Sequence, residues 1–388
     1  MVPNGWKQSE LGTVFDFKNG LNTDKEKYGR GYKFVNVMDV FGNSILTEEK
    51  IIGRVEVLEK QLKEYQLKYG DVLFNRTSET FDEIAMSAVY LDNVVATFGG
   101  FVIRGRPKVD DVLPDYSVYL FQSDDYRNQV IKLGQGAVRA NIGQKDLAKV
   151  NILLPPQQEQ QKIAQILSTW DKAIAVTEQL LANSQQQKKA LMQQLLTGKK
   201  RLLDENGARF EGEWEEFSLG NIAKVYQPKT ISQSQLSFDG YPVYGANGII
   251  GYYCDFNHEL EQIAVTCRGS TCGVVNWTMP KSWITGNAMV INVDNNSAIS
   301  KKFLFYVLSN ADLKYLITGS GQPQITGDIK NHVVHLASFK EQKVIAQVLT
   351  IADQEIEVLQ RKLDCLQQEK KALMQQLLTG KRRVKVAA

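Results

Sequence analysis

The chain has 388 residues, of which 43% are hydrophobic and 23% are charged, and its formal net charge is +3 at pH 7. This length is too great for one ordinary hydrophobic core, so we expect two to three domains of a soluble globular protein. A charge this close to zero neither requires nor excludes a nucleic-acid partner. The lack of an 18-residue apolar run and of a charged leader predicts a cytoplasmic protein with no membrane partner.

Residues 1–156 are predicted to form the first domain. Its opening, GWKQSELGTVFDF, contains Trp6, Leu11 and Gly12. The short apolar segments KFVNVMDV, GDVLFNRTSET, AMSAVYL and FGGFVIRG are broken by Gly, Asn and Asp and predict strands of a mixed sheet, whereas residues 115–132 predict one helix. A glycine-rich closing turn, GQGAVRANIGQKDL, leads into a last strand that two prolines end. We therefore expect a compact α+β domain.

Residues 200–338 are predicted to repeat this plan in a second domain. Its opening EWEEFSLGNIAKV places Trp214 208 residues after Trp6. The segment IAVTCRGST matches DVLFNRTSE so that Arg268 falls where Arg76 falls, a helix is expected over 301–316, and GSGQPQITGDIKNHVVHL closes the domain. The two domains differ in most other letters.

Two long helices are predicted over residues 157–199 and 339–383. Their C-terminal sequence KKALMQQLLTGK occurs at Lys188–Lys199 and again, 182 residues later, at Lys370–Lys381. Apolar residues follow a 3,4 spacing in both helices and predict the seam of an antiparallel coiled coil. The seam residues are Ile163, Trp170, Ile174, Leu181, Leu191, Leu195, Ile345, Ala352, Ile356, Leu363, Leu373 and Leu377. Lys188 and Lys370 also fall on it, where a polar residue weakens packing but can fix the register.

Each helix is followed by a glycine, Gly198 or Gly380, and then by a basic cluster. Glycine suits the left-handed position after a helix. The cations either cap the negative helix end or contact phosphate, and the first interpretation needs no partner.

Near-identical helices combined with divergent domains indicate that the two parts have different roles. An antiparallel pair of helices would relate the domains by a pseudo-two-fold axis. DNA has two-fold symmetry as well, so such a chain could read two separated half-sites of different sequence, that is, an asymmetric bipartite target.

No catalytic or metal site is predicted. The four cysteines lack metal-ligand spacing and are interpreted as reduced structural thiols. Neither a GxxxxGK[ST] loop for ATP nor the Asn/Asp-Pro-Pro-aromatic motif of an adenine methyltransferase occurs. We therefore expect no cofactor in this chain.

The whole chain resembles the specificity subunit of Type I restriction-modification enzymes. The resemblance is carried by the repeated KKALMQQLLTGK, the two domain openings, the two closing turns and the segment YPVYGANGIIGYY. It implies two target recognition domains, a double-stranded DNA partner and no catalysis by this chain. It also implies two methyltransferase subunits that use S-adenosylmethionine, and two restriction subunits with motor and nuclease activity that require ATP and Mg.

Candidate DNA-binding residues are ranked by type and position, and each has a structural alternative. Arginine can bind guanine with two hydrogen bonds, and Asn or Gln can do the same with adenine. The candidates in turns and strands are Arg76, Arg268, Arg139, Asn141, Gln322, Gln324, Arg104 and Lys281. Surface ion pairs and ordinary turn chemistry are the alternatives.

Three other functions remain open from the sequence. The chain could serve a related system in which one partner chain both cleaves and methylates DNA. It could be a coiled-coil scaffold that binds proteins only, or a free-standing endonuclease, for which no convincing set of residues was found.

Overall fold

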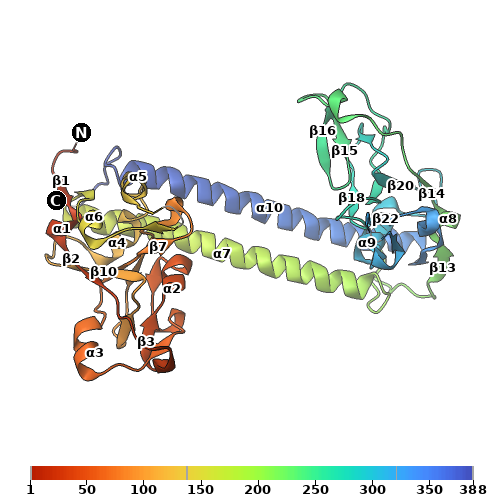
Figure 1. Ribbon diagram of the computed structural model, residues 1–388. Helices are drawn as coiled ribbons and strands as arrows, with labels where there is room; N and C mark the ends of the chain where they lie inside the picture. Colours follow the sequence, from red (N-terminus) through yellow and green to blue (C-terminus); the bar gives the residue numbers. More distant parts are fainter. Residues whose placement is uncertain (1, 137–138, 320, 387–388) are drawn as a thin grey trace. The chain divides into compact units, whose positions relative to one another are not determined.

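The computed structural model describes residues 2–136, 139–319 and 321–386. Residues 1, 387 and 388 lie outside the described part. So do residues 137, 138 and 320, which belong to the two closing turns predicted from the sequence. The chain divides into two compact units, one formed by Met1–Thr177 with Lys362–Ala388 and the other by Glu178–Arg361. Each unit therefore contains one globular domain of mixed α/β structure and a part of each long helix (Figure 1).

Unit 1 is built around a five-stranded sheet of order β2-β10-β6-β8-β4. Its strands are β2 Phe15–Asn19, β10 Val102–Pro107, β6 Val72–Asn75, β8 Ser87–Tyr90 and β4 Ile45–Leu46. All neighbours are antiparallel except β4 and β8. The central strand β6 is buried at every position, as its apolar sequence predicts.

Three smaller sheets complete unit 1. They are β5-β3-β9, β1-β12 and β7-β11. Their strands are β1 Lys7–Glu10, β3 Tyr28–Val35, β5 Arg54–Val55, β7 Thr77–Ser78, β9 Ala96–Phe98, β11 Ala140–Asn141 and β12 Asn151–Leu154. The pair β1-β12 joins the opening of the domain to the strand that precedes the first long helix.

One helix prediction and one strand prediction for unit 1 were wrong. The expected helix over 115–132 is broken into α4 Pro114–Leu120 and α5 Asp124–Leu133, because Ser123 accepts a hydrogen bond from Tyr126 N and starts a new helix. The segment KFVNVMDV is only partly strand. After β3 the chain forms α2 Val37–Gly42, which begins with a capping box between Asn36 and Asp39.

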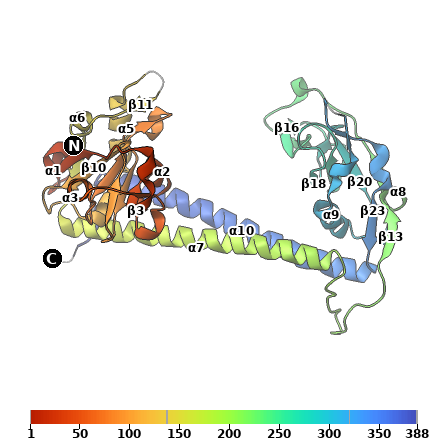
Figure 2. The same cartoon turned by 60° about the horizontal axis from the view of Figure 1, so that its bottom comes forward.

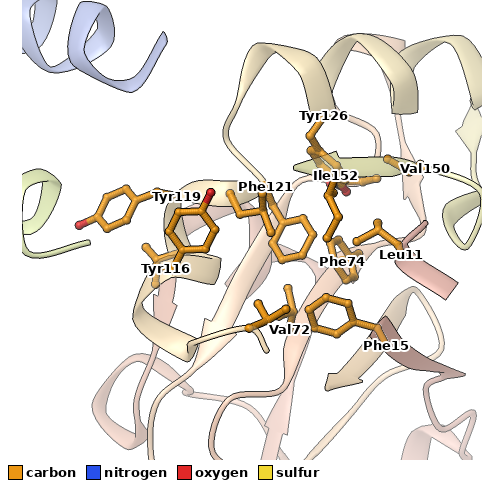
Figure 3. Packing of buried hydrophobic residues seen from close by; sticks show 14 of the residues in the cluster. Leu11, Phe15, Val72, Phe74, Tyr116, Tyr119, Phe121, Tyr126, Val150 and Ile152 are labelled. Carbon is orange, nitrogen blue, oxygen red and sulfur yellow. Dashed lines mark hydrogen bonds between the residues drawn. The ribbon is translucent and has the colours of Figure 1, made fainter. Parts of the chain in front are cut away.

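The core of unit 1 lies between the five-stranded sheet and its helices. Figure 3 shows Phe74, Phe121 and Phe15 packed together, with Tyr126 beside them. The same cluster includes buried residues from both long helices, among them Ile163, Leu167, Leu377 and Leu378. The domain therefore folds onto the helices and is not tethered to them by a linker alone.

Unit 2 has the same order of central strands. Its main sheet is β14-β20-β17-β18, accompanied by β16-β15-β19, β13-β23 and β21-β22 (Figure 2). The strands are β13 Glu215–Ser218, β14 Lys224–Tyr226, β15 Tyr241–Tyr244, β16 Ile249–Tyr253, β17 Ile263–Thr266, β18 Val275–Trp277, β19 Trp283–Ile284, β20 Ala288–Asn292, β21 Ile317–Thr318, β22 Gln324–Ile325 and β23 Val333–Leu336. In both units a strand from the domain opening pairs with the strand that precedes a long helix.

The helix expected over 301–316 is shorter than predicted. It is α9 Lys301–Asn310, and a separate 3₁₀ helix, η5 Leu313–Leu316, follows after Asp312 caps it by accepting from Lys314 N. The remaining short helices are α1 Leu11–Val14, α3 Glu59–Tyr65, α6 Gln144–Leu147 and α8 Leu219–Ile222, with the 3₁₀ helices η1 Lys25–Lys27, η2 Glu48–Lys50, η3 Phe81–Glu83, η4 Gln233–Gln235 and η6 Gly327–Asn331.

The two long helices are α7 Gln157–Leu195 and α10 Phe339–Leu377, each of 39 residues. Inside unit 2 they run antiparallel, because Ser184 contacts Glu355 whereas Lys188, further along α7, contacts the earlier Asp353 of α10. Of the predicted seam residues, six are buried and six are half-buried. The buried ones are Ile163, Leu181, Leu195, Ile345, Leu363 and Leu377, and the half-buried ones are Trp170, Ile174, Leu191, Ala352, Ile356 and Leu373.

The described residues include no helix that is both long enough and apolar enough to cross a membrane.

Candidate nucleic-acid interface

The central strands β6 and β17 end at equivalent positions in the two units. Arg76 and Arg268, which follow these strands, are not at equivalent positions. Val72 and Phe74 of β6 belong to the main core, as do Ile263 and Val265 of β17. Continuing along the strands, Arg76 O accepts a hydrogen bond from Ile142 N at 3.0 Å, and Cys267 O accepts one from Ile325 N at 3.0 Å. Arg76 therefore corresponds to Cys267.

The predicted match of Arg76 with Arg268 is thus wrong by one residue. The residue equivalent to Arg268 is Thr77. Both arginines are nevertheless exposed, and neither guanidinium forms a hydrogen bond or ion pair with any residue in the described part of the chain.

The two closing turns meet this strand end in the same way. Asn141 pairs with Thr77 on one side and with Gln135 on the other. In unit 2, Gln324 pairs with Arg268 and with Thr318. The backbone thus forms the same three-stranded arrangement in both units, although the side chains differ.

The other closing-turn candidates are also at matched positions. Arg139 lies two residues before Asn141, as Gln322 lies two residues before Gln324, and all four side chains are exposed. The Asn141 amide donates to Arg139 O at 3.0 Å. A positive φ follows the first paired residue in each turn, +120° at Gly136 and +88° at Gly319, which explains why glycine stands there.

Arg104 is wrongly placed among the candidates. Only 4% of it is exposed, and its guanidinium lies over the Phe98 ring at 5.8 Å. Burial, with a further contribution from the Arg106 charge, lowers the pKa of Arg104. Both faces of β10 are covered at this point, since Val102, Ile103 and Arg104 are all buried, so Arg104 is not available to a partner. Lys281 is exposed and lies 3.8 Å from Glu259 Oε1.

Each domain is attached to the long helices by the same Tyr–Asp–Lys contact. In unit 1, Tyr119 Oη donates to Asp171 Oδ2 at 2.7 Å, and Lys370 forms an ion pair with Asp171. The tyrosine ring lies at the margin of the core with its hydroxyl directed away from it (Figure 3). Lys370 Nζ is 5.7 Å from the ring centroid. The pKa of Tyr119 is raised, first by burial and then by Asp171.

Unit 2 repeats this contact with other residues. Tyr306 Oη donates to Asp353 Oδ2 at 2.7 Å, and Lys188 pairs with Asp353 and lies 5.8 Å from the tyrosine ring. Burial and Asp353 likewise raise the pKa of Tyr306. The two seam lysines of the sequence analysis are therefore ion-paired.

A Glu–Arg contact joins the start of one long helix to the segment that follows the other. Arg201 Nε donates to Glu341 Oε1 at 2.6 Å, and Glu341 is fully buried. Arg383 Nε donates to Glu159 Oε2 at 2.9 Å, and Trp6 Nε1 donates to the same oxygen at 3.3 Å.

The basic cluster after each helix therefore includes an arginine that satisfies a buried carboxylate, a role that neither interpretation of the sequence foresaw. Gly198 and Gly380 have φ values of +69° and +68°, as predicted for a helix end.

These contacts could have been found in part from the sequence. Glu159 and Asp171 recur as Glu341 and Asp353 at the helix offset, so their conservation between the copies was visible. The tyrosines were not recognised as a pair, although Tyr119 and Tyr306 lie in the helices expected over 115–132 and 301–316, at corresponding points of the two domains.

In the described ranges no three His, Cys, Asp or Glu side chains come close enough to hold a metal ion.

The chain is 26% identical to the Type I restriction enzyme MjaX specificity subunit of Methanocaldococcus jannaschii, over 99% of this chain and 95% of that protein. It is 24% identical to the MjaVIII specificity subunit of the same organism, over 69% of this chain and 71% of that protein.

Solved structures share the fold. The S subunit of a Type I restriction-modification system from M. genitalium matches with a TM-score of 0.66 at 18% identity, covering 97% of this chain and 98% of that one. The HsdS subunit of Thermoanaerobacter tengcongensis matches with a TM-score of 0.51 at 19% identity, covering 98% of both chains.

One family model, described as the Type I restriction modification DNA specificity domain, matches residues 3–183 and again residues 211–368. Each match contains one of the two globular domains and most of the long helix that follows it. The chain therefore belongs to the family of Type I restriction-modification DNA specificity domains, of which it carries two.

Proposed function

We propose that this chain is a sequence-specific double-stranded DNA binding subunit that reads an asymmetric bipartite target. It directs the methyltransferase and restriction subunits of a Type I restriction-modification complex to that target. Each domain reads one half of the target. The chain itself contributes recognition and performs no chemical step.

The proposal rests on what the two units share and where they differ. They share the order of the central strands, the Tyr–Asp–Lys contact and the Glu–Arg contact. They differ in the exposed side chains at the closing turns, where Arg139 and Asn141 correspond to Gln322 and Gln324. Two domains that read different half-sites need the same attachment to the long helices but different exposed side chains, and the two units have both features.

We further propose that α7 and α10 pair as an antiparallel coiled coil, which relates the units by a pseudo-two-fold axis and fixes the spacing of the half-sites. The repetition of both contact types in the two units supports this symmetry. Two similar helix surfaces then offer docking sites to two methyltransferase subunits, and two restriction subunits complete the complex. S-adenosylmethionine, ATP and Mg bind to those partner subunits.

The test is to co-express the chain with its methyltransferase partner and to map modified adenine across the host genome. We expect one split, asymmetric motif. Replacement of residues 20–156 by the corresponding region of a relative should change only one half of it. A contiguous motif that survives this exchange, or no motif at all, would contradict the proposal.

A further inference from the structure

A row of three side chains crosses the outer face of the small sheet where the closing turn meets the central strand. In unit 1 the row is Gln135, Asn141 and Thr77, and in unit 2 it is Thr318, Gln324 and Arg268. We call this set the cross-strand row. We propose that the cross-strand row of each unit reads base edges, an inference that rests on the proposed DNA-binding function.

The geometry places the three side chains of a row on one face. Residues directly opposite one another in antiparallel strands point to the same side, with their Cβ atoms about 5 Å apart. Most neighbours that alternate with the row are buried, namely Ser78 and Ala140 in unit 1 and Ile325 and Cys267 in unit 2. Arg76, which precedes Thr77, is the exception and is exposed. The row itself is exposed except for Thr77, which is half-buried.

The length of the row suits a short stretch of duplex. Three side chains at this spacing span about 10 Å. Successive base pairs rise by about 3.4 Å, so a row covers about three of them. The major groove is wide enough for a two-stranded ribbon. Two residues of each row, Gln135 with Asn141 and Thr318 with Gln324, are paired across such a ribbon in the closing turn, and Thr77 or Arg268 lies beside it on the third strand.

The side chains of the two rows differ, as is required if the rows recognise different base pairs. Residues that attach the domains to the helices are the same in both units, whereas the rows have different hydrogen-bonding groups on the same backbone. Arg268 provides a two-pronged donor suited to guanine. Asn141 and Gln324 each provide an amide suited to adenine. The Asn141 amide donates one hydrogen to Arg139 O, so its second hydrogen and its oxygen are left for a base.

Arg268 is also available for a ligand. Its guanidinium forms no hydrogen bond or ion pair within the ranges that the structure describes. A buried or ion-paired arginine such as Arg104 or Arg201 would need to break existing contacts first. The structure therefore assigns base reading in unit 2 to Arg268 and Gln324, and in unit 1 to Asn141 with Thr77.

The experiment selects bound duplexes from a randomised library, using the full chain together with its methyltransferase partner. For Arg268→Ala we expect a loss of about 10- to 100-fold in preference at one G·C pair of the half-site read by unit 2. The half-site read by unit 1 should stay unchanged and serves as the internal control for folding. Asn141→Ala should relax one A·T pair in the other half only.

A gain of function is the sharper arm of the test. Thr77→Arg combined with Asn141→Gln gives two positions of the unit 1 row the chemistry of unit 2, and should create a new guanine preference in the unit 1 half-site. Arg209→Ala is the matched control, since Arg209 is an exposed arginine of unit 2 outside the row and is not among the candidate DNA-binding residues, and it should leave the motif unchanged.

The outcomes separate the two proposals. A wild-type protein that selects no motif overturns the DNA-binding function and with it this inference. A wild-type protein with a split motif that all the row variants leave unaltered, or that they weaken uniformly at every base pair, overturns the inference alone.

Discussion

Glu341 is a carboxylate with no exposed surface, and Arg201 is the group that balances its charge. Removal of one partner of such a pair leaves a buried charge unmatched. We expect Arg201→Ala to lower the free energy of unfolding by about 3 kcal/mol, measured by chemical denaturation. Lys200→Ala, next to it and exposed, should have almost no effect. Equal stability of the two variants would contradict this role of Arg201.

Glu159 makes the stability of unit 1 dependent on pH. The hydrogen bond from Arg383 holds the pKa of Glu159 below its ordinary value of 4.5, although burial acts in the opposite direction. A carboxyl group with a lowered folded pKa stabilises the fold above the unfolded value, and this contribution is lost as the pH falls through the folded pKa.

We therefore expect the free energy of unfolding to decrease as the pH falls below 4.5, with a shallower decrease in Glu159→Gln. Urea titrations at pH 3 to 7 would measure it. Parallel curves for the two proteins would show that Glu159 does not carry the effect.

At the same scale, some site residues could be predicted from the sequence and others could not. Asn141 and Gln324 were found because a glycine-rich turn exposes its polar residues. Arg104 was misplaced because its charge suggested an exposed position, whereas β10 is buried on both faces around it. Arg268 was aligned with Arg76 because the two residues are identical, although the apolar pattern of the preceding residues pointed to a different alignment. The resulting error of one residue assigns a side chain to the opposite face of its strand.

At the scale of elements, a charged residue in the seam of the long helices should destabilise the packing of these helices. Leu191 and Leu373 occupy equivalent positions and pack against the cores of unit 2 and unit 1. We expect Leu191→Asp or Leu373→Asp to cost about 3 kcal/mol or more and to abolish DNA binding, because a carboxylate would be forced into an apolar contact.

Val176→Asp is the control for the seam, since Val176 lies on α7 but is 60% exposed. Stability would be followed by thermal denaturation and binding by gel shift. Wild-type binding by both seam variants would count against a role for the paired helices in recognition.

The attachment of each domain is a second element-scale prediction. Tyr119→Phe removes one hydrogen bond to an aspartate that keeps its lysine and should cost about 1 kcal/mol. Tyr306→Phe also removes the hydrogen bond between its hydroxyl and Thr350 Oγ1, and should cost at least as much. Tyr69→Phe removes the hydroxyl of a tyrosine that is 54% exposed and should cost less. The free energies of unfolding of the three variants decide whether the contacts contribute as the geometry indicates.

The elements themselves were predicted unequally. The long helices were predictable because their periodicity is sustained and the two copies support each other. The break between α4 and α5 was missed because Ser123 looks like any polar residue on an amphipathic helix, although its side chain caps the second one. The turn from β3 into α2 was missed for the same kind of reason, since a local capping box overrode an apolar run.

For the whole molecule, binding should depend strongly on salt. A protein that neutralises several phosphates releases their counterions, so affinity for the duplex should fall by on the order of 10³ between 50 and 200 mM salt. Fluorescence anisotropy with a duplex that contains the mapped motif would measure the slope. Absence of duplex binding at every salt concentration would favour a scaffold that binds proteins only.

The composition of unit 1 has a consequence for how the protein is made. Unit 2 is continuous in sequence, but the core of unit 1 needs Leu377 and Leu378. At about 5–20 residues per second, a ribosome delivers them some ten seconds or more after it has made the first segment of unit 1, Met1–Thr177. The domain that is synthesised first is thus the last to be completed. A chain that terminates before residue 362 would lack Leu377 and Leu378, so Ile163 and Leu167 would lose part of the core in which they pack. The N-terminal domain would then be destabilised, although it is distant in sequence from the site of termination.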